Sequence, residues 1–304
     1  MRLADVRGWL SRRPAVVPPP APPAGPRPSR LSAPPEPGPP AVPVRPATWP
    51  PARLAVTHRL WGEGFVLPGG AEDVLRLATP LGLSSASSLL LLGCGAGGPA
   101  RCIASLFGAW VAGYEADPAL IAEATAVCAR ANLGKRVRIA AWSPAAPEFP
   151  AHSCHHVVAL DPFRQAAAGK LLEALGRALR PGGQVTLLAT VAGPDFDPSA
   201  EEAAAWLRLE GGSAVLPEQD TITEALTSRR FDVRVTEDLS AAHMHQVVQA
   251  WRGLVRGLRE AGTRPSASLA EPLVREAELW LRRARLVRTG RLRWVRWHAI
   301  GRAG

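Results

Sequence analysis

The chain of 304 residues is poor in several features that would point to particular classes of protein. It has four cysteines without a CxxC pair, which excludes a disulfide framework and is typical of free thiols in a reducing compartment. It lacks the apolar stretch of roughly 18 residues that a transmembrane helix needs. Its one tyrosine, Tyr114, and its two lysines, Lys135 and Lys170, do not form a Tyr-xxx-Lys hydride-transfer pair.

The shortage of lysine makes the basic charge unusual in composition. The formal net charge is +10, and nearly all the positive charge is arginine. Such basicity favours nucleic-acid binding when it gathers in a patch. Here the arginines are scattered, and the abundance of Ala, Pro and Gly beside them indicates the codon bias of a GC-rich bacterial genome. We therefore expect no nucleic-acid partner.

Proline divides the chain into two parts. More than half of the 31 prolines fall in residues 1–51, where they remove backbone donors and prevent a packed core. This predicts a disordered, Pro-rich tail over 1–51 and one globular domain over 52–304. The pair Arg12-Arg13 is followed by prolines and not by the apolar region of an export signal, so we expect a cytoplasmic protein.

The globular part alternates strand and helix signals. The apolar run at 88–92 reads as a buried parallel strand. The alternation that follows predicts an α/β fold, a doubly wound and mostly parallel seven-stranded sheet with helices on both faces. The predicted strands are 88–92, 109–113, 137–141, 156–160, 184–191, 231–235 and 291–297, and the predicted helices include 71–78, 99–107, 118–131 and 169–179.

A glycine-rich turn connects the first strand to its helix. Residues 92–99 read Leu-Gly-Cys-Gly-Ala-Gly-Gly-Pro, directly after the leucine run. Glycine permits a tight turn and close approach of a cofactor to the backbone. An ordinary Gly-rich turn is the alternative. The candidate cofactor-binding residues here are Gly93, Cys94, Gly95 and Gly97.

A carboxylate follows the second strand, about 20 residues after the glycine turn, at the distance typical of a ribose-binding acid. This is Glu115, with Ala116 beside it as a further candidate contact. The alternative is a solvated charge at the end of a strand. Asp117 is expected to cap the next helix, because Pro118 suits the first helical position.

The glycine turn and the carboxylate of Glu115 alone also fit a nicotinamide enzyme, since Gly93, Gly95 and Gly98 satisfy GxGxxG. The turn Pro181-Gly182-Gly183 distinguishes the cases, because it closely resembles the turn before the fifth strand of S-adenosylmethionine (SAM) methyltransferases. The segment 60–70, Leu-Trp-Gly-Glu-Gly-Phe-Val-Leu-Pro-Gly-Gly, resembles the one that precedes the first strand in phosphoethanolamine methyltransferases.

Residues 58–300 thus resemble the small-molecule class I (Rossmann-like) SAM-dependent methyltransferases, including the phosphoethanolamine and the sterol or tocopherol types. The resemblance implies SAM as cofactor, an antiparallel C-terminal edge of the sheet, and methyl transfer to a small molecule or lipid head group. A non-catalytic scaffold or accessory protein with the same fold is the main alternative. A nucleic-acid methyltransferase is weaker, because the chain offers only Asp161-Pro162-Phe163 where an Asn/Asp-Pro-Pro-Tyr/Phe motif is expected.

The chain departs from that family at two places. Related enzymes often carry Gly-Asp after the third strand, where the acid contacts adenine, whereas this chain has Trp142-Ser143. Ser143 is a candidate hydrogen-bond partner of adenine, and Trp142 either stacks on the base or packs in the core. Phosphoethanolamine enzymes also use a tyrosine ahead of the pre-strand glycines, and none is present here.

Candidate catalytic residues lie at the carboxyl ends of the strands. Asp161 follows the fourth strand, where it either orients an acceptor or caps the turn before Pro162. His243 is a candidate general base at a helix start, and His245 should face away from it. We expect no metal, because neighbouring strand residues such as His155 and His156 point to opposite faces. Residues 195–219 are a candidate lid.

The last part of the chain alternates arginine with large apolar residues over 276–297. One interpretation is a basic amphipathic surface for anionic lipid. The preferred one is that the apolar residues pack onto the sheet while the arginine tips reach solvent.

Overall fold

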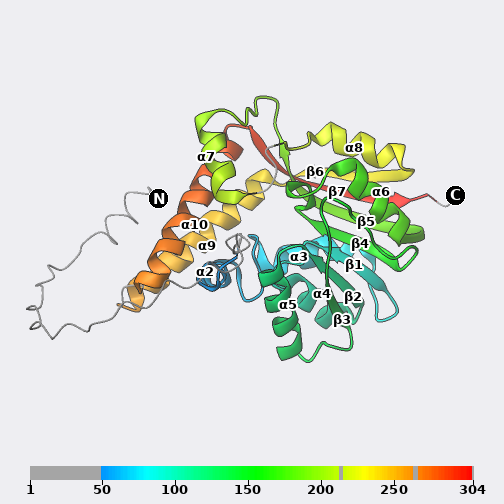
Figure 1. Ribbon diagram of the computed structural model, residues 1–304, viewed down its shortest axis with the longest axis horizontal. Coiled ribbons are helices and arrows are strands. Elements are labelled where there is room, and N and C mark those ends of the chain that lie inside the picture. The colour runs from blue at the N-terminus through cyan, green and yellow to red at the C-terminus, as the bar shows by residue number, and fades with distance from the viewer. Residues whose placement is uncertain (1–48, 212–214, 263–265, 303–304) are drawn as a thin grey trace, which may run out of the picture.

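A seven-stranded sheet organises the computed structural model, which describes residues 49–211, 215–262 and 266–302 (Figure 1). The strand order is β3-β2-β1-β4-β5-β7-β6. Pairs among β1 to β5 are parallel, and β7 runs antiparallel to both β5 and β6. The predicted sheet and its antiparallel edge are therefore confirmed. The strands are β1 (Ser88–Leu92), β2 (Trp110–Glu115), β3 (Val137–Ala141), β4 (Cys154–Leu160), β5 (Leu179–Ala192), β6 (Phe231–Asp238) and β7 (Leu292–Gly301).

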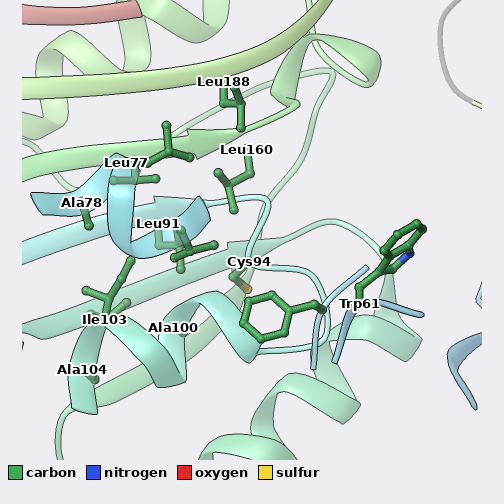
Figure 2. Close-up of a cluster of buried hydrophobic side chains, with 14 of the residues drawn as sticks. Trp61, Leu77, Ala78, Leu91, Cys94, Ala100, Ile103, Ala104, Leu160 and Leu188 are labelled. Atoms are coloured by element: carbon green, nitrogen blue, oxygen red, sulfur yellow. The ribbon is translucent and has the colours of Figure 1, made fainter. Parts of the chain in front are cut away.

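Two apolar layers cover the sheet, one on each face. Because side chains alternate along a strand, Leu89 and Leu91 of β1 enter one layer, whereas Leu90 and Leu92 enter the other. Figure 2 shows part of the first layer, with Leu91 between side chains of α3 and side chains of α4. The second layer packs under α6 and α8. The helices around the sheet are α3 (Gly70–Ala78), α4 (Gly98–Phe107), α5 (Pro118–Arg130), α6 (Ala168–Ala178) and α8 (Gln219–Ser228).

The order of the strands reverses at β1, which pairs with β2 on one side and β4 on the other. In open α/β sheets a ligand crevice forms beyond the carboxyl ends of the strands at such a point. The glycine turn after β1 therefore lies at the position that favours ligand binding.

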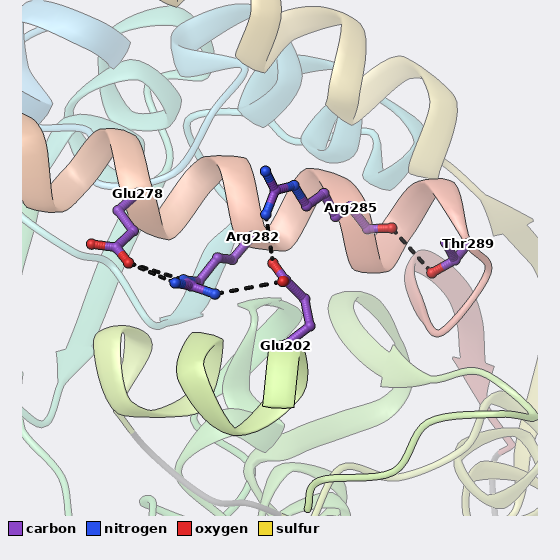
Figure 3. A network of polar contacts seen from close by, with 5 residues as sticks. All are labelled: Glu202, Glu278, Arg282, Arg285 and Thr289. Carbon is purple, nitrogen blue, oxygen red and sulfur yellow. Dashed lines mark hydrogen bonds and ion pairs between the residues drawn. The ribbon is translucent and has the colours of Figure 1, made fainter. Parts of the chain in front are cut away.

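Four helices gather beyond one end of the sheet, and we call them the cap (Figure 1). An ion pair connects the first of these helices to the last one, because Nε of Arg53 lies 3.0 Å from Oε2 of Glu276. Figure 3 shows a second connection, in which Glu202 accepts hydrogen bonds from Arg282 and Arg285. The cap helices are α2 (Pro51–Trp61), α7 (Glu201–Glu210), α9 (Ser240–Glu260) and α10 (Ala267–Arg288).

The candidate lid, residues 195–219, contains α7. Trp206 of this helix is fully buried and packs with Leu279 and Leu286 of α10. Residues 212–214 lie outside the described part of the chain, so the lid stays a prediction. The predicted tail also lies outside it over residues 1–48, and α2 begins at Pro51, the last residue assigned to that tail.

The sequence-based boundaries match the structure at β1 and β3 and differ at the other five strands, and two of these differences bear on the site. β2 extends to Glu115 and so carries the candidate carboxylate as its last residue. β5 begins at Leu179, because the Pro-Gly-Gly turn is absorbed into the strand and its pairing with β4 shifts between Cys154 and His156. No helix in the described residues is long and apolar enough to cross a membrane.

The predicted packing of residues 276–297 is confirmed for the tryptophans of this segment. The prediction that its arginine tips reach solvent is wrong for Arg283. Trp280, Trp294 and Trp297 are all buried. Arg283, however, is only 1% exposed, so its tip does not reach solvent. The reason is that Arg283 shares the apolar stripe of α10 with Leu279 and Leu286, spaced four and three residues away.

Candidate functional site

The glycine turn after β1 has a backbone that only glycine adopts without strain. Gly93 has φ +71°, and a Cβ built there would lie 2.4 Å from the carbonyl oxygen of Leu160. Gly95 has φ +55°, and its Cβ would lie 2.7 Å from Cγ2 of Val66. The N–H groups of Gly93 and Cys94 both donate to the carbonyl of Tyr114. The turn is thereby fixed against the end of β2.

Glu115 lies directly beside this turn. Its Oε2 accepts from the N–H of Gly95 at 2.9 Å, and its Oε1 accepts from the N–H of Ala116 at 2.8 Å. The side chain is buried, and burial raises its pKa while these backbone N–H groups oppose the rise. The expected meeting of the acid and the glycine turn is therefore present in the fold.

The capping prediction for Asp117 is confirmed. Its Oδ1 accepts from the N–H groups of Ala119 and Leu120, and Pro118 occupies the first position of α5. This hydrogen bonding fixes the start of α5 immediately after Glu115.

The segment before the first strand covers the glycine turn. The carbonyl of Gly64 accepts from the N–H of Gly98 at 2.8 Å, and Val66 lies over Gly95. The cavity left between this segment and the ends of the strands measures about 30 Å³. Small-molecule sites usually enclose about 300–1,000 Å³, so this cavity in its present shape does not hold a nucleoside-sized ligand.

Trp142 and Ser143 follow β3 next to Glu115. The N–H of Trp142 donates to the carbonyl of Glu115 at 3.2 Å, and its ring centroid lies 6.2 Å from that of Phe149. The indole therefore packs against the core, and its Nε1 is buried without a partner among the described residues. Ser143 is exposed. Both residues lie where the sequence placed them, at the end of the sheet that carries the glycine turn.

Asp161 is engaged with the neighbouring strand. Its backbone is left-handed, with φ +49°, and its two carboxylate oxygens accept from the N–H and the hydroxyl of Thr190 at 2.7 and 2.9 Å. Burial raises its pKa, and Arg283 and Arg164 oppose that rise. The side chain makes no capping hydrogen bond to the 3-10 helix η2 (Pro162–Arg164), so the capping interpretation is wrong.

His243 is buried in the cap. Its ring stacks on Trp294 with centroids 4.8 Å apart, and Trp280 lies 5.8 Å away. Neither ring nitrogen has a partner in the described part of the chain. Burial, together with the charge of Arg283, holds its pKa well below the ordinary value. His245 is exposed, which confirms that the two histidines face opposite ways.

Sequence reasoning missed Arg283, which connects these groups. Its Nη2 donates to the Thr190 hydroxyl at 2.7 Å, and its Nη1 lies 3.6 Å from Glu210. Its guanidinium also lies over the rings of Trp280 and Trp294, at 5.3 and 5.1 Å. The available signal was an arginine inside the apolar stripe of a helix. The histidines 152, 155 and 156 form no metal-binding group of three or more ligands within the described ranges.

Residues 89–183, which carry the glycine turn, Glu115 and Asp161, match the family model described as a methyltransferase domain. The chain also shares its fold with solved structures of SAM-dependent methyltransferases. Among curated proteins the chain resembles the sterol 24-C-methyltransferase of Yarrowia lipolytica, at 27% identity over 184 residues, which is 59% of this chain and 48% of that protein. The chain thus spans about half the length of this curated relative.

Two solved methyltransferase structures share the fold. Phosphoethanolamine N-methyltransferase 2 of Haemonchus contortus, in complex with phosphomonomethylethanolamine and S-adenosylhomocysteine, superposes with a TM-score of 0.72 at 21% identity. The match covers 82% of this chain and 57% of that one. Geranyl diphosphate C-methyltransferase of Streptomyces coelicolor has a TM-score of 0.58 at 15% identity, with coverage of 75% and 78%. Such identities establish the shared fold.

Proposed function

We propose that this protein binds SAM and transfers its methyl group to a small molecule or lipid. The observation that carries the proposal is the Glu115 carboxylate, which accepts from the N–H of Gly95 inside the glycine turn. A carboxylate in this place is suited to accept the hydroxyls of a ribose, and glycines are suited to a ligand that lies against the backbone.

Different candidate binding residues would contact different parts of SAM. Gly93, Cys94, Gly95 and Gly97 form the surface against which the amino-acid end would lie. Glu115 would hold the ribose, and the adenine would lie among Ala116, Trp142 and Ser143. This set of donors and acceptors fits SAM, provided that the segment around Val66 moves away from Gly95.

SAM supplies a methyl group on a positively charged sulfur, which keeps the electron pair of the broken carbon–sulfur bond while the acceptor supplies the pair of the new bond. The protein then has to align the two reactants and exclude water. Orientation of this kind supplies roughly 7–11 kcal/mol in favourable cases, so no catalytic triad is required.

Two residues are proposed to assist the acceptor. His243 is held neutral by burial, and its ring nitrogens have no partner among the described residues, which suits a base for an acceptor that carries a proton. Asp161 is proposed to position the acceptor through Thr190, since both of its oxygens are already engaged there. The four free cysteines and the arginine-rich composition favour a bacterial cytoplasmic location.

Titration calorimetry of SAM into the full chain tests this function. We expect saturable binding, and Glu115→Ala should weaken it about 10- to 100-fold, because a hydrogen bond to a charged group contributes about 1.5–3 kcal/mol. Glu173→Ala, which removes an exposed carboxylate from α6, is the control and should bind like the unmodified chain. Equal affinities for the two variants would refute the site.

One observation favours a second candidate function. Val66 covers Gly95, and the adjoining cavity is much smaller than SAM, which suits a scaffold or accessory protein that keeps the fold without the cofactor. The same titration separates the two functions. A well-folded chain that binds no SAM would favour the scaffold.

A further inference from the structure

The small cavity beside the glycine turn extends toward the antiparallel edge of the sheet. Gly93 and Gly95 form its near wall, and Trp294 of β7 belongs to its far wall. The position next to the proposed methyl donor makes this cavity the place for the group that receives the methyl. Side chains from four elements, α3, β4, β5 and β7, contribute Val74, Leu77, Leu160, Leu188 and Trp294 to its walls.

Apart from the carboxylate of Asp73, these walls are apolar. Figure 2 shows Leu77, Leu160 and Leu188 converging from α3, β4 and β5 above Cys94. Phe65 and Val66 close the cavity from the covering segment. If that segment moves outward to admit a cofactor, the walls from the helix and the three strands remain, and they present hydrocarbon and one indole ring to the acceptor.

The carboxylate that lines the cavity is already paired. Asp73 Oδ1 accepts from Arg76 at 2.9 Å and from Gln246 at 2.8 Å. An incoming ammonium group would compete with the Arg76 guanidinium for this carboxylate. The charge of Asp73 is already balanced by Arg76, and a buried ammonium without a counter-charge of its own is costly, so this wall does not favour a cationic acceptor.

The cations beside the wall residues are paired as well. Arg76 forms an ion pair with Asp73. Arg283, whose guanidinium lies over the ring of Trp294, donates to Thr190 and faces Glu210. A phosphate or carboxylate that entered would meet no counter-charge on the walls themselves. The residues that form this cavity therefore include no cation that would recognise an anionic head group.

We infer that the acceptor is an apolar molecule whose reacting portion is uncharged, seated on the wall formed by Val74, Leu77, Leu160, Leu188 and Trp294. This inference rests on the proposed function and narrows it, since it excludes phosphorylated head groups as the part that enters the cavity. Burial of apolar surface contributes about 25 cal/mol per Å² and supplies the affinity that charge pairing does not.

A pair of probes with the same apolar chain tests the inference. The full chain is first titrated with S-adenosylhomocysteine and then, in its presence, with decan-1-ol or with decyl phosphate. We expect saturable binding of decanol, at least tenfold tighter than that of decyl phosphate. Tighter or equal binding of the phosphate, or no saturable binding of decanol, would overturn the inference. Loss of tight phosphate binding in Arg283→Met would then identify the anion site.

Two substitutions on one strand locate the binding. Leu188→Gln places an amide on the cavity wall, whereas Leu187→Gln places the same amide on the opposite face of β5, in the other apolar layer. Decanol should bind Leu188→Gln at least tenfold more weakly than Leu187→Gln, and equal affinities would place decanol elsewhere. If either variant fails to fold, the comparison of the two probes on the unmodified chain still decides. Failure of S-adenosylhomocysteine to bind would instead refute the proposed function.

Discussion

The glycine turn and the cap meet at the same end of the sheet, yet they are held in place by different kinds of contact. Around the turn the contacts are backbone hydrogen bonds, such as those from Gly93 and Cys94 to Tyr114. In the cap they are side-chain pairs between residues far apart in the chain, such as Arg53 with Glu276 and Arg282 with Glu202. The turn is therefore held mainly through its backbone, whereas the cap depends on side-chain pairs between helices that are far apart in the chain.

Because of this difference, substitutions in the turn and substitutions in the cap should affect different properties of the protein. A substitution in the turn should remove ligand binding while it leaves the cap assembled, because the turn is fixed by the backbone of neighbouring strands. A substitution in the buried pairs of the cap should lower the stability of the whole domain, because α10 contacts α2, α7 and β7.

Arg283 offers the sharpest test of the cap. Arg283→Met removes a guanidinium that is only 1% exposed, together with its hydrogen bond to Thr190 and its ion pair with the partly buried Glu210, and should lower the free energy of unfolding by about 1–3 kcal/mol. Arg285→Met is the control on the same helix, and its half-exposed pair with Glu202 should contribute at most about 1 kcal/mol. Guanidinium chloride denaturation measures both. Equal losses would mean that the buried arginine is no more important than the surface one.

Gly93 offers the matching test of the turn. Gly93→Ala introduces a Cβ 2.4 Å from the carbonyl oxygen of Leu160, so the turn must shift and SAM affinity should fall at least about tenfold, which corresponds to about 1.4 kcal/mol. Gly82→Ala is the control, because Gly82 has a similar positive φ of +63° with open space around its Cβ. Calorimetry compares the variants once circular dichroism has shown that both fold. Similar SAM affinities would contradict the assignment of the turn.

The pH dependence of the free energy of unfolding tests the burial of His243 in the cap. Its folded pKa lies well below 6.5, so the unfolded chain takes up a proton as the pH falls through that value while the folded chain does not. The free energy of unfolding should therefore fall by up to about 1.4 kcal/mol per pH unit below 6.5. His243→Phe should remove this part of the slope, and His245→Phe, at an exposed position on α9, should keep it. Denaturation at several pH values measures both, and an unchanged slope in His243→Phe would mean that this histidine titrates normally.

Part of the candidate site could be read from sequence because its signals are local. Glycines after a leucine run, followed about 20 residues later by Glu115, define a strand, a turn and a second strand with little help from the rest of the chain. The same reasoning placed Asp117 as a cap and Trp142 at the end of β3. It did not find Arg283, because its place in the apolar stripe of α10 was the one local signal and its partner Thr190 lies 93 residues away in the chain.

The sequence by itself determined the parallel sheet, the glycine turn and the acid beside it, because hydrophobic periodicity and glycine act within a few residues. Only the tertiary structure decided that Val66 covers Gly95, that Arg283 is buried on Thr190 and that His243 lies against Trp294. Each of these depends on elements brought together from distant parts of the chain, and their burial and charges are set by what packs against them and not by their neighbours in sequence.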